Sequence, residues 1–212
     1  MAAKDVKKKV RPYRSTLRAQ GAADTRRNIL DTAMRLFLEQ GYGKVTVNDI
    51  AGEASLAAAT VYASAGGKAA ILSTLIDEAM RDSIVEETLA AVRKSKSGEE
   101  VVRIAVHGTR IDNERYHDIV EVMKNAAAVD GAANDILQRS DTAYRQALGQ
   151  IARRMRTLKV VRGGLTEARV IDILWFYLGR EAWHLLAADR RWTFDEAERW
   201  LTEQTVGALL EQ

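Results

Sequence analysis

The residues best suited to chemistry in this sequence are the basic side chains near its amino terminus. Between Lys4 and Arg27, nine lysines and arginines are opposed only by Asp5 and Asp24, which gives this stretch a charge of +7. Because the whole chain carries +3, the remaining residues together carry −4. Clustered ammonium and guanidinium groups are suited to binding the phosphates of nucleic acids. The alternative is a solvated tail that only aids solubility, and composition favours neither interpretation.

Residue patterns typical of catalysis are missing from the sequence. The three histidines, His107, His117 and His184, do not have the spacing of helical metal ligands. The chain has no cysteine, which excludes a thiol nucleophile, disulfide bonds and thiolate metal sites. It also lacks a Gly-x-Ser-x-Gly turn and a phosphate-binding glycine loop. We therefore expect a binding protein rather than an enzyme, with no cofactor and no metal.

The composition predicts an all-α fold. Of the 212 residues, 47% are apolar and 29% are charged, and Pro12 is the single proline. Alanine, leucine, glutamate and arginine recur along the chain, and all four favour helices. No apolar run approaches the roughly 20 residues that a membrane-spanning helix needs, and the basic amino terminus lacks the apolar core of a secretory signal. We expect a cytoplasmic protein of about nine helices, without a membrane partner.

The first part of the chain predicts a basic arm followed by three short helices. Residues 1–22 lack apolar periodicity, which favours a flexible arm. A helix is expected from Asp24 to the glycines at 41 and 43, a second from Thr46 with Asp49 as its capping partner, and a third over 57–65 after a break at 55–56. Helices this short are stable only when packed on their neighbours. Two short helices joined by a tight turn form a helix-turn-helix, whose second helix enters the major groove of DNA.

The rest of the chain predicts longer helices. Apolar periodicity and capping residues place them at about 68–92, 98–111, 114–129, 132–159, 166–188 and 193–210. The expected organisation is a flexible basic arm at 1–22, a helix-turn-helix DNA-binding domain at 23–70, and an effector-binding and dimerisation domain at 71–212.

The stretch from Thr25 to Leu72 resembles the amino-terminal region of the tetracycline-repressor-like (TetR) family. The motifs IL-TAMRLFLEQGY, T-V-N-D-I-A, T-V-Y and G-K-A-A-I-L follow one another in the family's order and spacing, without a gap, over 48 residues. The resemblance implies a transcriptional regulator that binds double-stranded DNA. It assigns phosphate contacts to Lys44, Thr46, Thr60, Tyr62 and Lys68, and a surface facing the base edges to Ala57, Ala58, Ala59, Ala63 and Ser64.

Two departures from the family pattern bear on DNA recognition. The expected recognition helix is mostly alanine, where family members often carry basic or aromatic side chains. Ala65 stands where the family usually has a bulky aromatic residue that holds this helix in place. Alanine can touch a thymine methyl but cannot hydrogen-bond a base. We therefore expect affinity to come mainly from phosphates and the basic arm, and the third helix to be held less firmly than usual.

For the rest of the chain, the resemblance implies an effector pocket and a homodimer formed by the last two helices. Apolar side chains of these helices either face the partner or fill the monomer's own core. Residues of mixed aromatic and polar type that are suited to lining a pocket for a small organic effector are Tyr116, His117, Met123, Tyr144, Trp175 and His184. The expected function is that of a ligand-responsive regulator, a repressor by the family's default, which binds a near-palindromic operator as a dimer. A helical protein–protein adaptor is the alternative.

Overall fold

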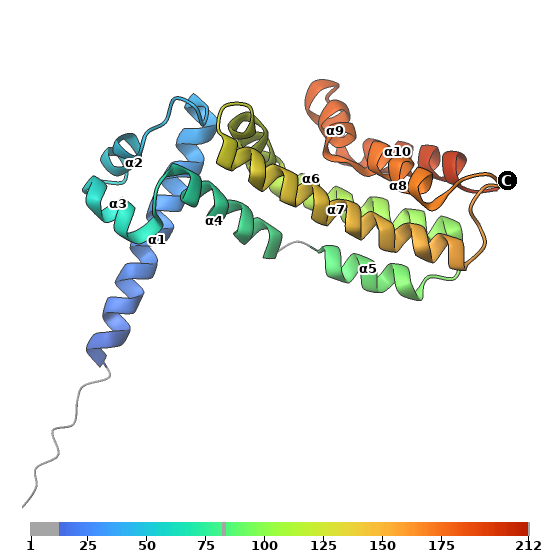
Figure 1. Ribbon diagram of the computed structural model, residues 1–212, viewed down its shortest axis with the longest axis horizontal. Helices are drawn as coiled ribbons and strands as arrows, with labels where there is room; N and C mark the ends of the chain where they lie inside the picture. Colours follow the sequence, from blue (N-terminus) through green and yellow to red (C-terminus); the bar gives the residue numbers. More distant parts are fainter. Residues whose placement is uncertain (1–12, 82–83, 212) are drawn as a thin grey trace, which may run out of the picture. The chain divides into compact units, whose positions relative to one another are not determined.

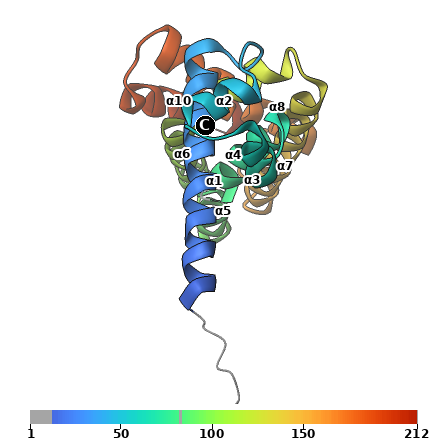
Figure 2. The ribbon, with the colours of Figure 1, turned by 90° about the vertical axis from the view of Figure 1, so that its left-hand side faces the viewer.

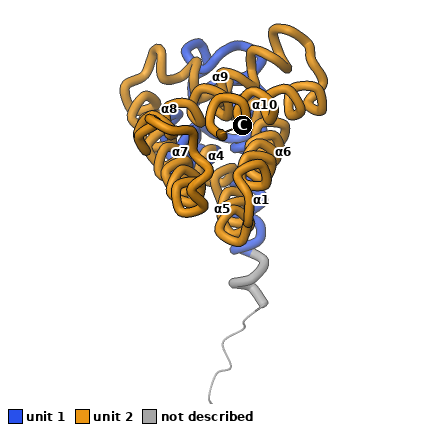
Figure 3. Tube along the Cα trace, turned by 90° about the vertical axis from the view of Figure 1, so that its right-hand side faces the viewer, with its two compact units in different colours: residues 1–75 blue, residues 76–212 orange. Residues whose placement is uncertain are grey.

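The computed structural model describes residues 13–81 and 84–211. These residues form helices and contain no β-strand apart from an isolated bridge between Val161 and Leu210. The chain divides into an N-terminal unit, residues 1–75, and a C-terminal unit, residues 76–212 (Figure 3). No helix among the described residues is long and apolar enough to cross a membrane.

The N-terminal unit is a three-helix assembly completed by the first turns of a fourth helix (Figure 1). Its elements are α1 (Tyr13–Gln40), α2 (Val47–Glu53), α3 (Ala58–Ala65) and the start of α4 (Lys68–Arg81). The helices α2 and α3 pack on each other and on α1. The buried side chains of this unit come from α1 to α4 and from the loop before α2. They include Ile29, Ala33, Phe37, Tyr42, Ile50, Val61, Ile71 and Leu72.

The first helix begins well before the expected start at Asp24. Of the predicted arm, residues 1–12 lie outside the described residues, whereas Tyr13 already belongs to α1. The early turns have no apolar stripe, so periodicity gave no indication of a helix, but their alanine, arginine and glutamine residues favour one intrinsically. Gly21 does not interrupt it. In Figure 2 these turns project beyond α2 and α3, which agrees with the exposure of Arg18.

The C-terminal unit is built around two long antiparallel helices, α6 (Gly98–Ala127) and α7 (Gly131–Thr157). The shorter α5 (Val85–Lys94) packs against both. Two further helices, α8 (Glu167–Leu178) and α10 (Phe194–Leu209), pack on each other and cover the other side of the pair (Figure 1). The buried core of this unit includes Val102, Leu148, Met155, Leu174, Leu178, Trp183 and Leu201.

Three further helix boundaries differ from the expected ones, in addition to the start of α1. The predicted helix from 68 to 92 is divided into α4 and α5, and the carboxylate of Asp112 accepts the amide of Ile84 (3.2 Å) just before α5. The two helices predicted at 98–111 and 114–129 form one helix, α6. It is kinked at a single non-helical residue, Tyr116. No glycine or proline occurs between 109 and 117 to end the helix there.

The third difference lies at Gly179, which divides the predicted helix 166–188. Gly179 ends α8 and precedes a short α9 (Arg180–Trp183) and a π-helical turn, η1 (His184–Asp189). A Cβ atom at Gly179 would lie 2.4 Å from the carbonyl oxygen of Trp175. The close approach of this residue to the last turn of α8 therefore requires glycine here, and the helix ends at this residue.

Candidate DNA-binding surface and internal cavity

The second helix starts with a complete capping box. The hydroxyl of Thr46 accepts the amide of Asp49 (3.2 Å), and the Asp49 carboxylate accepts both the hydroxyl (2.7 Å) and the amide (2.8 Å) of Thr46. These hydrogen bonds to Thr46 hold the pKa of Asp49 below its usual value, so Asp49 stays charged at the exposed end of α2. Thr46 is exposed, but its two donor groups already bind within the chain.

The third helix has a buried face and a solvent-exposed face. Val61 and Ala65 point into the core, with 0% and 5% of their surface exposed. The opposite face carries Ala59, Tyr62 and Ala63, which are all exposed. Tyr62 retains 57% of its surface, which places its ring outside the core. Residues spaced three and four apart share one face of a helix, so these three side chains form a continuous outer surface.

The other predicted DNA contacts surround this outer surface. Ala57, Thr60 and Lys44 are exposed, whereas Ala58 and Ser64 are half-buried. The ammonium group of Lys68 donates to the carbonyl oxygen of Tyr42 (2.9 Å) and lies 4.2 Å from the centre of the Tyr42 ring. Lys68 therefore joins the start of α4 to the loop before α2. These assignments remain predictions, because the structure contains no DNA.

The helix-turn-helix itself carries no positive charge. Between Val45 and Gly67 the sequence contains no lysine, arginine or histidine, but it contains Asp49 and Glu53. The nearest basic residue by sequence is Lys44 on one side and Lys68 on the other. Ionic contacts of this unit with phosphates must therefore come from basic residues outside α2 and α3.

An arginine from α1 holds the end of α3. One guanidinium nitrogen of Arg26 donates to the carbonyl oxygen of Ser64 (2.5 Å), and the other donates to the hydroxyl of Thr74 on α4 (3.1 Å). A cation at the carboxyl end of a helix is also favoured by the helix dipole. Ala65 leaves α3 without a large buried side chain at its end. Arg26 supplies polar contacts at the same end of the helix.

We predict that Arg26→Gln destabilises the N-terminal unit by about 1–3 kcal/mol, the range for loss of hydrogen bonds to a charged group. The neighbouring Arg27 is exposed, so Arg27→Gln makes the same change of charge as a control and should stay within about 0.5 kcal/mol of the parent. Urea denaturation followed by circular dichroism measures both variants. Equal stability of the two would show that Arg26 does not hold α3.

The C-terminal unit encloses a cavity of about 370 Å³. It lies between α5, α6 and α7, and Ile76, Ala79 and Met80 at the end of α4 contribute to its wall. The wall is mostly apolar, with side chains such as Leu89, Ile119 and Ile151. A volume of this order, with apolar walls and few polar groups, is typical of sites for small organic ligands.

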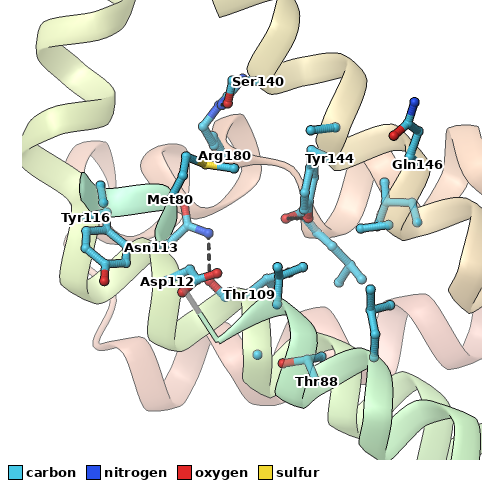
Figure 4. A pocket seen from close by; sticks show the side chains of 18 of the residues that line it. Met80, Thr88, Thr109, Asp112, Asn113, Tyr116, Ser140, Tyr144, Gln146 and Arg180 are labelled. Carbon is cyan, nitrogen blue, oxygen red and sulfur yellow. Dashed lines mark hydrogen bonds between the residues drawn. The ribbon is translucent and has the colours of Figure 1, made fainter. Parts of the chain in front are cut away.

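Several of the polar groups in the cavity wall hydrogen-bond within the chain, and Figure 4 shows the bond between Asn113 and Thr109. The Tyr144 hydroxyl donates to the carbonyl oxygen of Leu178 (2.7 Å), and its burial raises the pKa of this phenol. The side-chain amide of Asn113 donates to the carbonyl oxygen of Thr109 (2.7 Å). Arg180 forms an ion pair with Asp141. Hydrophobic contact is therefore the main interaction that these walls offer to a ligand.

Only three of the six predicted ligand residues line the cavity. Tyr116, Met123 and Tyr144 line the cavity. His117 and His184 stack 5.7 Å apart beside a recess of only about 10 Å³. Trp175 packs against the Tyr144 ring at 5.5 Å but does not line the cavity itself.

Sequence reasoning missed several residues of the cavity wall, among them Met80, Asp112 and Arg180. None of them stands out in the sequence, because each belongs to a helix with many similar charged or apolar residues. The kink at Tyr116 lies in the cavity wall and the π-helical turn after Trp183 lies beside the smaller recess, and neither has a sequence signature.

Comparison with known proteins places this geometry in a family. The model of "Bacterial regulatory proteins, tetR family" matches residues 29–75, which include α2, α3 and the start of α4. A protein of Mycobacterium tuberculosis, described as an uncharacterized HTH-type transcriptional regulator, is 30% identical over 150 residues, which cover 69% of this chain and 68% of that protein. The chain belongs to the tetR family. It is a transcriptional regulator with an N-terminal helix-turn-helix DNA-binding domain.

Solved structures share the fold at low sequence identity. NalD, the secondary repressor of the MexAB-OprM multidrug efflux pump in Pseudomonas aeruginosa, is 17% identical with a TM-score of 0.73, over 91% of this chain and 99% of that one. SmeT, in a complex with triclosan, is 18% identical with a TM-score of 0.70, over 89% and 93%. FadR from Bacillus subtilis, in complex with stearoyl-CoA, is 18% identical with a TM-score of 0.66, over 85% and 97%. These tetR-type structures confirm the all-α architecture.

Proposed function

We propose that this tetR-family chain is a repressor that binds a near-palindromic operator as a homodimer and is released by a small organic effector. The observation that carries the proposal is the sharing of α4 between the two units. Its first turns place Ile71 and Leu72 in the core of the DNA-binding unit, and its last turns place Ala79 and Met80 in the cavity wall. A ligand that displaces the end of α4 acts on the same helix that Arg26 joins to α3.

The effector would shift the protein toward a conformation that fits DNA poorly. A ligand changes an equilibrium only if it binds one conformation better than the other. The apolar cavity favours an organic molecule with a hydrophobic body. Two related structures hold such molecules, triclosan in SmeT and stearoyl-CoA in FadR of Bacillus subtilis.

A homodimer through α8 and α10 is supported by apolar side chains that the monomer leaves exposed. Phe176 on α8 has 71% of its surface exposed and Leu185 on η1 has 51%, while Trp192 and Trp200 are also exposed. By contrast, Leu201 on α10 is fully buried in the core of its own unit. Trp200 and Phe176 therefore carry the dimer proposal. Two recognition helices about 34 Å apart would match half-sites one helical turn apart.

The proposed function is tested by selecting bound fragments from the genome of the source organism and then displacing the protein with hydrophobic compounds. We expect a sequence shared by the bound fragments, and release by at least one compound. Ala147→Phe puts a ring into the cavity wall, because Ala147 is only 8% exposed. The Ala147→Phe variant should still bind DNA, but the hydrophobic compounds should no longer release it from DNA. Ala132→Phe, at an exposed position of α7 outside the cavity, should behave like the parent.

The contrary outcomes distinguish the alternatives. If the protein binds no duplex at low salt, the proposed DNA-binding function is contradicted, and a helical protein–protein adaptor is favoured. If the compounds release Ala147→Phe and the parent from DNA equally well, the effector does not bind in this cavity.

The dimer makes a separate prediction. Phe176→Glu should shift the protein from dimer to monomer, because a buried unpaired carboxylate in an apolar interface costs several kcal/mol. Light scattering coupled to size-exclusion chromatography measures the mass. Val129→Glu is a matched control, since Val129 is similarly exposed, at 66%, but lies beyond the end of α6. A parent protein that is monomeric at micromolar concentration would contradict the dimer.

A further inference from the structure

The outer face of α3 offers methyl groups where recognition helices commonly offer hydrogen-bonding side chains. Ala59 and Ala63 are both exposed and lie four residues apart, so their Cβ atoms are about 5–6 Å from each other on one face. Successive base pairs along one strand are about 3.4 Å apart. Two such methyl groups can therefore contact two neighbouring base steps at once.

Neither α2 nor α3 carries a cation that could contact guanine. The commonest sequence-specific contact in the major groove is an arginine or lysine bound to guanine O6 and N7. No basic residue occurs between Val45 and Gly67. Arg26 and Lys68, which lie next to α3, are already engaged within the chain, Arg26 with Ser64 and Thr74, and Lys68 with Tyr42. Guanine therefore has no ionic partner on α2 or α3.

The hydroxyl groups near this face do not replace such contacts, and Ser64, whose hydroxyl was expected to face the base edges, is half-buried. Thr46 is engaged by Asp49 in the capping box. Thr60 and Tyr62 are exposed, and hydroxyl groups at the edge of a recognition helix commonly donate to phosphate oxygens, which carry no sequence information. Among the groups on base edges in the major groove, the thymine C5 methyl is the apolar one, and an alanine methyl is its natural partner.

We propose that α3 recognises its operator through thymine methyl groups, contacted by Ala59 and Ala63, and makes no guanine contact. The proposal rests on the proposed function, because it specifies which DNA that same surface prefers. Each operator half-site carries thymines at neighbouring positions facing α3. Affinity comes from phosphates contacted by basic residues outside the helix-turn-helix, and discrimination comes from the burial of methyl groups.

Replacing thymine by uracil tests this directly, because uracil keeps every hydrogen-bonding group of thymine and lacks only the methyl. The full-length chain is first used to select duplexes from a pool of random 30-base-pair sequences made with dTTP. The enriched duplex is then resynthesised with single thymines changed to uracil. We expect affinity to fall about fourfold for each contacted methyl, the equivalent of one buried methylene group. The unselected pool should bind equally tightly whether it is synthesised with dTTP or with dUTP.

Two further measurements make the test specific. Replacing guanine by 7-deazaguanine removes the N7 acceptor and should change affinity less than about twofold, the effect expected where no direct base contact is lost. The variant Ala59→Ser, which presents a hydroxyl to the thymine methyl, should reduce the difference between thymine and uracil. Ala132→Ser, at an exposed site in the other unit, should leave that difference unchanged.

The possible failures are distinct. If no duplex is enriched from the thymine pool, sequence-specific DNA binding itself is wrong, and the inference falls with it. If a duplex is enriched but uracil binds as tightly as thymine at every position, or 7-deazaguanine weakens binding, only the thymine proposal is overturned.

Discussion

Changing five of the seven basic residues of the amino-terminal arm (residues 1–22) to glutamine should lower DNA affinity by on the order of a hundredfold at physiological salt. The reason is the charge of the helix-turn-helix, which between Val45 and Gly67 contains two acidic residues and no basic ones. Attraction to phosphates must come from elsewhere, and the arm has the highest density of cations in the sequence. The residues to be changed are Lys4, Lys7, Lys8, Lys9 and Arg11.

Fluorescence anisotropy at several salt concentrations measures this effect. The slope of log affinity against log salt should become shallower by about 0.9 for each phosphate contact that is lost. The control makes the same change of charge at five exposed positions of the C-terminal unit, which are Arg93, Lys94, Lys96, Arg103 and Arg139. The control should keep the parent slope. An arm variant with parental affinity and slope would mean that the arm is only a solvated tail.

Trp183→Ala should destabilise the C-terminal unit by about 3–5 kcal/mol, the usual cost of removing a large buried aromatic side chain. Trp183 has 1% of its surface exposed and stacks on Phe194 with ring centres 6.0 Å apart. Its indole nitrogen donates to the hydroxyl of Thr109 in the cavity wall (3.2 Å). The substitution leaves a void and removes a hydrogen bond that joins α9 to α6.

Thermal and urea denaturation measure this loss, with Trp192→Ala as the matched control. Trp192 is 36% exposed, so its removal should cost the monomer's fold much less. If the two tryptophan variants unfold at the same denaturant concentration, Trp183 does not support the unit as its burial indicates. Because Thr109 is a wall residue, Trp183→Ala should also weaken binding of any ligand found for the cavity.

The helix-turn-helix was predictable from sequence because its determinants are local. Thr46 and Asp49 are three residues apart and form the capping box that their spacing predicts. Gly66, with φ of +80°, ends α3 where the pair of glycines indicated. The apolar spacing of Ile50 and Val61 placed both side chains in the core, and both are fully buried.

The parts that sequence reasoning missed depend on contacts between distant residues or on absent features. Arg26 and Ser64 are far apart in the chain, and nothing near Arg26 distinguishes it from Arg27. The early turns of α1 have no apolar stripe, and their described residues 18–24 are exposed, so periodicity could not reveal them. The cavity forms where three helices leave space between them, and its polar residues Asp112 and Arg180 resemble ordinary surface charges in the sequence.

The most direct test of the central claim is a competition between two DNA duplexes for the full-length protein at 0.15 M salt. One duplex carries the selected operator, and the other has the same length and composition in scrambled order. We expect a preference of at least about a thousandfold for the operator, the lower end of the range for specific regulators. Equal binding of the two duplexes would contradict sequence-specific regulation, and would leave only the electrostatic attraction of a basic arm.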